Sequence, residues 1–302
     1  MRKLALIAVV AGLVVAACGA STPSSGPSSS ETGTATCAKS NLHLVNAGKL
    51  TVGTDNPAYP PYFEGGTTKG SQWKLNDPDT GKGFESAVAY AVAEQMGFSK
   101  GEVTWVVAPF TQTYAPGPKS WDFAIEQISY SPKRAQAVDF SDSYYNESEA
   151  LVAVKGTPIT RATSISDLRP YTLAAPTGST SYDIITNVIK PATEPRAYHS
   201  LADAVAALNA HQVDGIIVDF PTALYIADPY VQKVKNSVVV GQFPATANSE
   251  HFGMTFVRGN PLVQCVNRAL AALKSSGKLQ AITTEWLSKK TNVGEVPVFS
   301  AS

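Results

Sequence analysis

A short polar segment places a hydroxyl and a guanidinium at a spacing that suits an anion. Residues 128–145 read ISYSPKRAQAVDFSDSYY, in which Ser129 follows an apolar stretch and Arg134 comes five positions later. Arginine presents paired planar donors that a carboxylate accepts through both of its oxygens. The segment therefore predicts a carboxylate clamp just beyond a strand end, although most isolated arginines are simply solvated at the surface.

Two other segments place groups that can bind a charged ligand at the start of an expected helix and at the end of an expected strand. Gly178, Ser179 and Thr180 follow a strand and open a helix, whose first N–H groups attract negative charge. Asp219 ends the apolar strand 213–218, where a carboxylate can pair with an ammonium group. Each has an ordinary alternative, because Gly-Ser-Thr is a common capping turn and Asp219 can be the N-cap of the next helix.

The N-terminal residues have the features of an export signal. Residues 1–17 join a basic start to an apolar run that is shorter than the about 20 residues of a membrane-spanning helix, and they end in Val-Ala-Ala before Cys18. This lipobox pattern predicts that Cys18 is lipidated and holds the chain at a membrane surface. The alternative is ordinary secretory cleavage beside an accidental cysteine. Residues 18–36 are rich in Ser, Thr, Pro, Gly and Ala and predict a flexible tether.

Charge and cysteine content narrow the class of protein. The chain has 24 basic and 24 acidic residues, and removal of Arg2 and Lys3 with the signal leaves 22 against 24. Such a balance argues against nucleic-acid binding, which requires a basic patch or stripe.

Cys37 and Cys265 are the two cysteines that remain besides Cys18. An even pair in an exported chain predicts a disulfide, with two free buried thiols as the alternative. We expect no metal site and no cofactor.

Strand-like and helix-like segments alternate along the rest of the chain, which indicates an α/β fold with parallel strands and ligands at strand ends. The chain is long enough for two lobes. The expected strands are 49–54, 103–107, 122–129, 171–175 and 213–218, and the expected helices include one that ends at Gly97, 179–188, 201–210 and 278–289.

Several segments, in their order along the chain, resemble the polar amino-acid (family 3) periplasmic solute-binding proteins. They include 48–55, 59–63, 83–85, the Arg134 segment, 178–180, 213–219, 252–254 and 267–286. Ser131 stands where that family usually has Thr, and Pro116 and Pro118 break a helix that usually follows Phe110.

The resemblance implies a two-lobed periplasmic-binding-protein fold of type II, the Venus-flytrap fold. It places residues 37–147 and 247–302 in the first lobe and residues 148–246 in the second. Two crossing strands, near 146–150 and 245–251, form the hinge of a closing motion.

The resemblance also implies a role for each candidate ligand-binding residue. Arg134 and Ser129 would bind the α-carboxylate of an amino acid, and Gly178, Ser179 and Thr180 would grip it from the second lobe. Asp219 would take the α-amino group.

Further residues would surround the rest of the ligand. Tyr59 and Phe110 match the aromatic platform of the family, and Gln127 would offer its backbone carbonyl to the ammonium. Asp55 and Glu126 would favour a cationic group on the ligand, or are structural carboxylates satisfied by amides. Tyr62 and Phe63 we interpret as core residues, which is also an alternative for Phe110.

The function so implied is capture of a free amino acid by the substrate-binding lipoprotein of an ABC importer, at the outer face of the cell membrane. Its partner would be a membrane permease with a cytoplasmic ATPase, and we expect a monomer without enzymatic activity. The alternatives are a dehydratase acting on cyclic carboxylates with the same fold, and a sensor domain. Against an enzyme, the four histidines are scattered and form no nucleophile–base pair at a motif spacing.

Overall fold

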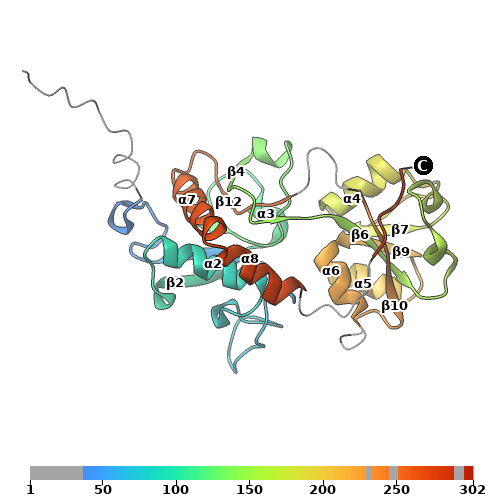
Figure 1. The fold of residues 1–302 in the computed structure, drawn as a ribbon, viewed down its shortest axis with the longest axis horizontal. Coiled ribbons are helices and arrows are strands. Elements are labelled where there is room, and N and C mark those ends of the chain that lie inside the picture. Colours follow the sequence, from blue (N-terminus) through green and yellow to red (C-terminus); the bar gives the residue numbers. More distant parts are fainter. Residues whose placement is uncertain (1–36, 229–230, 232, 245–250, 289–295, 302) are drawn as a thin grey trace, which may run out of the picture.

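The computed structural model describes residues 37–228, 231, 233–244, 251–288 and 296–301, and it has two lobes (Figure 1). Each lobe contains a five-stranded sheet. In the first lobe the strand order is β2 (Val103–Val107), β1 (Leu50–Thr54), β3 (Phe123–Ala124), β12 (Thr255–Val257) and β4 (Val138–Phe140). The strands β1, β2 and β3 are parallel, and β12 runs antiparallel to β3 and β4.

The third expected strand, 122–129, is much shorter in the structure. Only Phe123–Ala124 pairs as a strand, and Gln127 then adopts a left-handed backbone with φ of 47°. The chain turns away from the sheet there, which places the residues between Ala124 and Arg134 at the carboxyl end of the parallel strands.

Helices α2 (Phe84–Gln95), α7 (Leu262–Ser275) and α8 (Lys278–Thr283) pack on the first sheet. A Cβ on Gly83, just before α2, would lie 2.4 Å from the Tyr62 carbonyl oxygen, so only glycine fits this approach. The predicted stop of this helix at Gly97 is confirmed, since α2 ends two residues earlier and Gly97 has a φ of 83°. Tyr62 and Phe63 are each 1% exposed, which confirms their assignment to the core.

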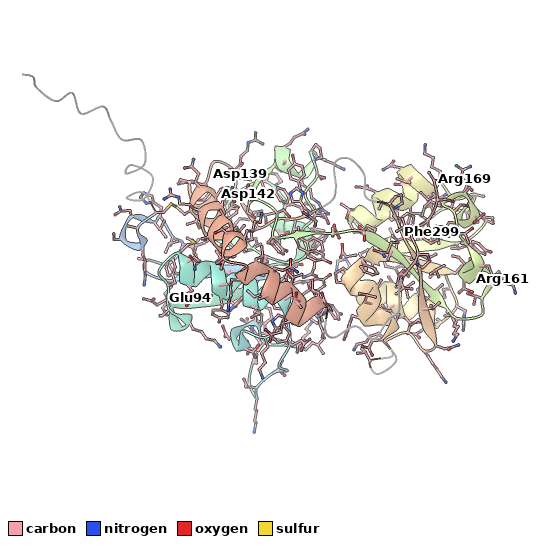
Figure 2. The ribbon with its side chains drawn as sticks, in the orientation of Figure 1. Glu94, Asp139, Asp142, Arg161, Arg169 and Phe299 are labelled. Carbon is pink, nitrogen blue, oxygen red and sulfur yellow. A yellow bond between two sulfur atoms is a disulfide. The ribbon has the colours of Figure 1, made fainter. Side chains whose placement is uncertain are left out.

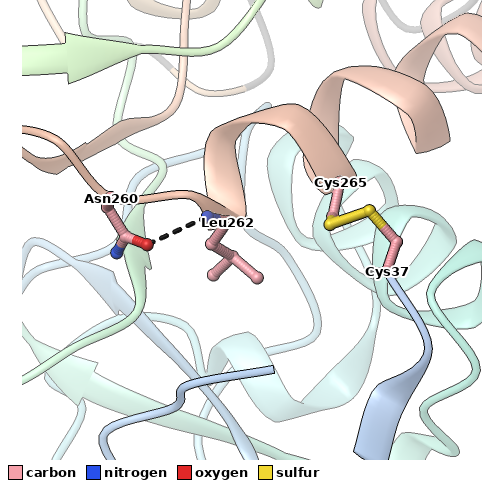
Figure 3. The surroundings of a disulfide bond; sticks show 4 residues. All are labelled: Cys37, Asn260, Leu262 and Cys265. Carbon is pink, nitrogen blue, oxygen red and sulfur yellow. Dashed lines mark hydrogen bonds between the residues drawn. A yellow bond between two sulfur atoms is a disulfide. The ribbon is translucent and has the colours of Figure 1, made fainter. Parts of the chain in front are cut away.

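The predicted disulfide is present between Cys37 and Cys265, with a Cα–Cα distance of 5.5 Å (Figure 3). It joins the start of the described chain to α7, a helix of the first lobe. Asn260 lies at the beginning of α7 and its Oδ1 accepts a hydrogen bond from Leu262 N at 3.0 Å. This bond satisfies one of the backbone donors that a helix start leaves without a partner.

In the second lobe the strand order is β10 (Ser237–Gln242), β6 (Glu149–Val154), β9 (Gly215–Asp219), β7 (Leu173–Pro176) and β8 (Arg196–Tyr198). Its helices are α4 (Thr180–Ile184), which continues as a π-helical turn at Ile185–Ile189, α5 (Leu201–Asn209) and α6 (Phe220–Ala227). The helix α5 is capped at its start, because Ser200 Oγ accepts a hydrogen bond from Asp203 N at 3.2 Å.

Shorter elements complete the chain. They are α3 (Phe110–Thr113), the 3₁₀ turns Lys39–Asn41, Pro78–Thr80, Lys100–Glu102, Arg134–Gln136, Pro158–Arg161 and Ser166–Leu168, and a π-helical turn at Thr284–Ser288. The single turn of α3 agrees with the prediction that the prolines after it break a longer helix.

A two-stranded ribbon lies between the lobes along the chain. Strand β5 (Tyr145–Asn146) pairs antiparallel with β11 (His251–Phe252), and β5 is followed within three residues by β6 of the second sheet. The other expected crossing, 245–251, lies almost wholly outside the described residues.

The C-terminal segment 296–301 packs on the second lobe, whereas the sequence analysis placed it in the first. Val298 bridges to Gln242 of β10, and Phe299 packs on Phe243 with ring centroids 5.3 Å apart. Figure 2 shows Phe299 among the side chains of the second lobe. The physical reason is that the Phe299 ring packs on β10 at Gly241. A Cβ on Gly241 would lie 2.6 Å from this ring, so only glycine leaves room for the aromatic side chain.

The signal peptide, the lipobox cysteine Cys18 and the tether all fall in residues 1–36, outside the described residues. Within the described part of the chain, none of the helices is both long enough and apolar enough to cross a membrane.

Candidate ligand-binding site where the lobes meet

Arg134 connects the two lobes. Its side chain is buried, its Nη1 donates to the Ser129 carbonyl oxygen at 2.7 Å, and its Nη2 donates to the Gly178 carbonyl oxygen at 2.8 Å. Ser129 belongs to the first lobe, and Gly178 lies between β7 and α4 of the second. The structure thus brings together three residues of the predicted carboxylate clamp, and backbone carbonyls accept from the guanidinium in this conformation.

Two aromatic rings of the first lobe face the same guanidinium. The Arg134 Cζ lies 4.4 Å from the Tyr114 ring centroid and 5.4 Å from that of Phe110. The Tyr114 hydroxyl also donates to the Gly178 carbonyl oxygen at 3.3 Å, and a Cβ on Gly178 would lie 2.7 Å from that hydroxyl. A bulkier residue than glycine would therefore push the second lobe off Tyr114.

Tyr114 was not among the predicted site residues. The signal that could have pointed to it is the proline-containing segment 111–120, where the chain departs from the family pattern. Phe110 was expected to contact the ligand as a platform, and in the structure its ring contacts Arg134 and Tyr114.

The helix start at Ser179 and Thr180 contributes hydroxyl groups. Ser179 Oγ accepts from Tyr182 N at 3.1 Å and caps α4. Thr180 Oγ1 donates to Glu149 Oε1 at 2.8 Å and lies 3.2 Å from Ser129 Oγ, across the lobes. The start of α4 therefore faces Ser129 of the first lobe, so that hydroxyl groups of both lobes can contact the same ligand.

Three carboxyl groups gather beside these hydroxyls: Glu147, Glu149 and Asp219 each have an oxygen within 4.8 Å of the others. Glu149 of β6 and Asp219 of β9 are register partners in an antiparallel pair, so they share a face of the sheet. Among the described residues they form the group that is close enough to share a metal ion. Glu147 and Glu149 were missed by the sequence analysis, and their spacing of two at the start of a strand was the available signal.

The carboxyl groups of Glu147 and Asp219 lie close together, with one oxygen of each within 4.8 Å of the other. Burial raises the pKa of Glu147 well above its usual value, and the nearby charges of Asp219 and Glu149 raise it further. Burial also raises the pKa of Asp219, while the neighbouring Glu147 carboxyl group and the charge of Arg134 oppose that rise. Asp219 occupies the N-cap position of α6, as the alternative expected, but its side chain makes no capping hydrogen bond and is left to face Glu147.

Carboxyl groups of the first lobe lie near the same region. Glu126 is 5% exposed and its Oε2 has no hydrogen-bond partner among the described residues. Burial raises the pKa of Glu126 well above its usual value, and the charges of Asp55 and Glu85 add to this. Asp55 is half-buried, and its Oδ1 accepts from Asn56 N at 2.7 Å.

Glu85, at the start of α2, holds Gln127 in place. It accepts from Gln127 N at 2.6 Å, and also from Gln127 Nε2 and the Tyr144 hydroxyl. Burial raises the pKa of Glu85 to about 7, although these three donors lower it. The side chain of Gln127 is thus committed to Glu85, and the role predicted for its backbone carbonyl stays a prediction.

Two tyrosines of the first lobe lie close to groups of the second lobe. Tyr59 is half-buried, and burial together with the charges of Asp55 and Asp203 raises its pKa. The buried Tyr62 hydroxyl lies 3.1 Å from Thr222 Oγ1 of the second lobe. Tyr62 therefore serves both the core, as expected, and the contact between lobes.

A guanidinium, hydroxyls from both lobes and an excess of buried carboxyl groups can together bind a small zwitterion or an organic cation, because each charged end meets an opposite charge. Two lobes joined by a ribbon around such groups define the class of two-lobed solute-binding proteins. Residues 50–289 match the model of the bacterial extracellular solute-binding proteins, family 3, and the chain belongs to this family.

Individual relatives agree with this assignment. The chain is 27% identical to the ABC transporter glutamine-binding protein GlnH of Bacillus subtilis (strain 168), over 94% of this chain and 96% of the relative. It is 27% identical to the ABC transporter arginine-binding protein 1 of Escherichia coli (strain K12), over 68% of this chain and 81% of the relative. A solved ancestral arginine-binding protein bound to arginine superposes with a TM-score of 0.64 at 25% identity, over 80% of this chain and 99% of that one.

Proposed function

We propose that this protein is the amino-acid-binding component of an ABC importer, which captures a free amino acid between its lobes and presents it to a membrane permease. The observation that carries the proposal is the convergence on Arg134 of hydrogen-bonding groups from both lobes, with Asp219 close enough for the charge of Arg134 to act on it. The glutamine-binding and arginine-binding relatives support the same class of ligand and the same transport role.

In this proposal Arg134 binds the α-carboxylate, which takes the place of a backbone carbonyl as acceptor. Ser129 and Thr180 supply hydroxyl donors from the two lobes, and Asp219 accepts from the α-ammonium. Because one zwitterion then spans both lobes, its binding favours the closed arrangement over the open one.

The remaining carboxyl groups favour an amino acid with a cationic side chain. Glu126 presents a buried oxygen without a donor, and Asp55 lies close enough to raise its pKa. A guanidinium or ammonium group between them would satisfy both, and the rings of Tyr59 and Phe110 would attract the same charge.

A thermal-shift screen against the common amino acids, followed by calorimetry, tests the proposal. Truncating one partner of a buried charged pair costs about 2 to 5 kcal/mol, so Arg134→Ala and Asp219→Ala should each weaken binding at least about thirtyfold. Near wild-type affinity in either folded variant would remove that residue from the site. Turnover of a cyclic carboxylate on incubation would instead place the protein among the dehydratases.

Anchoring through Cys18 belongs to the same proposal. The lipobox and the polar segment 19–36 support it, because a lipid on Cys18 would hold the binding lobes on a tether near the permease. Cys18→Ser should release the protein into the medium with its ligand affinity intact. Retention of that variant on the membrane would contradict the lipid anchor while leaving the ligand-binding proposal untouched.

A further inference from the structure

Glu147 is a buried acid without the donors that a buried carboxylate needs. It is 6% exposed, and Ser129 Oγ donates to its Oε1 at 2.6 Å. Its Oε2 accepts from no amide or hydroxyl of the described residues. A second acid, Asp219, has a carboxyl oxygen within 4.8 Å of a Glu147 oxygen. Two carboxyl groups can bond to each other only through a proton that they share, because ionised carboxylates are acceptors alone.

The charges around Glu147 and Asp219 favour a state in which these two carboxyl groups carry one proton between them. Asp219 and Glu149 bring negative charge to Glu147, and Arg134 brings a positive charge that acts on Asp219. Among the described residues, the titratable side chains that face Glu147 from other elements include the tyrosines Tyr62, Tyr144 and Tyr145, whose phenols stay neutral near pH 7 because burial raises their pKa further above 7. Like charges so close together cannot both ionise in a buried setting.

We propose that Glu147 is a ligand-contacting residue and that, with Asp219, it holds a shared proton which the ammonium group of the captured amino acid displaces. The inference rests on the proposed function, since it assumes that an amino acid binds where the lobes meet. The ammonium arrives with its own protons and donates to both carboxylates, and the displaced proton leaves to solvent. Capture then releases one proton for each amino acid bound.

Proton release makes the association constant for the amino acid depend on pH. If one proton leaves on binding, the association constant rises about tenfold for each unit of pH while the pair still carries that proton. The enthalpy of binding also varies with the ionisation enthalpy of the buffer, and this variation counts the protons directly. The probe is L-arginine, chosen for the acidic surroundings, or the amino acid that ranks first in the thermal-shift screen.

The test compares wild type with Glu147→Gln by calorimetry in phosphate and Tris buffers between pH 6 and 8. We expect about one proton released by wild type and none by Glu147→Gln, whose amide can donate to Asp219 in place of the shared proton. The affinity of the variant should be lower at pH 8 and flat with pH. The wild-type proton count stands without the variant, so a variant that fails to fold leaves the proposal testable.

Two controls separate this pair from other acids. Glu149→Gln leaves Glu147 and Asp219 in place and changes a buried acid that already accepts from the Thr180 and Ser181 hydroxyls. The release should therefore persist but shift to lower pH, because a negative charge that raises the pKa of Glu147 is lost. Glu85→Gln removes a buried acid of the first lobe whose pKa is about 7, and the release should persist there too.

The possible results of these experiments contradict different parts of the proposal. Binding of the amino acid with no proton released by wild type, or equal release by wild type and Glu147→Gln, would overturn the shared proton. Stabilisation by Ca²⁺ or Zn²⁺ alone, with competition against the amino acid, would show that Glu147, Glu149 and Asp219 hold a metal and would also overturn it. Binding of none of the amino acids would instead contradict the proposed function.

Discussion

Glu85 and Glu147 are both buried carboxyl groups near the ribbon between the lobes, yet their oxygens are satisfied in different ways. Glu85 accepts from a backbone amide, a side-chain amide and a phenol, all from the first lobe. Glu147 accepts from one serine and otherwise faces Asp219 of the second lobe. A buried acid with several donors fixes the local backbone, whereas one that lacks donors has capacity left for a cationic ligand.

The comparison extends to the regions around the two residues. The region of Glu85 includes the helix α2, the core of the first lobe and the disulfide that joins Cys37 to α7. The region of Glu147 includes Arg134 and Asp219, with groups from both lobes. We therefore expect changes near Glu85 to lower stability and changes near Glu147 or Glu126 to alter binding.

The largest stability effect should come from the disulfide. Cys37 and Cys265 are 228 positions apart, and closing so long a loop contributes about 5 kcal/mol in the chain-entropy model. Replacing both by serine should lower the free energy of unfolding in urea by that order while the folded variant keeps its ligand affinity. Two reactive thiols in the denatured, non-reduced wild type would show that the bond does not form in the protein as produced.

A pH-dependent effect should follow from Glu85. Its pKa is about 7 in the folded protein against 4.5 for an ordinary glutamate, so the folded state holds an extra proton between these values and its stability falls as pH rises through them. The full shift corresponds to about 3 kcal/mol. Relative to wild type, Glu85→Gln should therefore gain about that much unfolding free energy between pH 4 and pH 8.

Urea denaturation at several pH values measures this difference, and subtracting wild type cancels the contributions of other acids. A difference that stays constant with pH would mean that the donors from Gln127 and Tyr144 keep Glu85 ionised throughout.

Tyr114 should affect binding through Arg134. A cation over an aromatic ring gains about 0.5 to 2 kcal/mol, so Tyr114→Ala should weaken amino-acid binding by about tenfold in calorimetry. Tyr114→Phe keeps the ring and loses only the bond to the Gly178 carbonyl, so it should lose less than about threefold. Equal losses in the two variants would assign the effect to the hydroxyl and not to the ring.

The smallest expected change comes from Glu126. Glu126→Gln removes a buried acid whose Oε2 has no donor, so the unfolding free energy at pH 8 should rise by about 1 kcal/mol. Any preference for L-arginine over L-glutamine should shrink in the same variant. Glu94→Gln, an exposed position on α2, is the matched control and should change neither quantity. Unaltered selectivity in Glu126→Gln would exclude Glu126 from contact with the ligand side chain.

Much of the first lobe and of the clamp was predictable from local sequence. The strand at 103–107 is β2 with the same bounds, Gly97 follows the end of a helix as expected, and the helix expected at 201–210 is α5. The predicted group Ser129, Arg134 and Gly178 converges in space. These features follow from short-range rules, since strand runs, caps and turn residues act within a few positions of the chain.

The sequence alone determined the α/β class, the elements that carry the charged residues, the pairing of the two cysteines and the position of Arg134 beyond a strand end. Tertiary structure alone decided that Glu147 faces Asp219, that Tyr114 stacks on Arg134, and that residues 296–301 pack on the second lobe. The reason is that these contacts join segments distant along the chain, and they depend on strand register and on how the lobes meet. Local periodicity specifies neither of these.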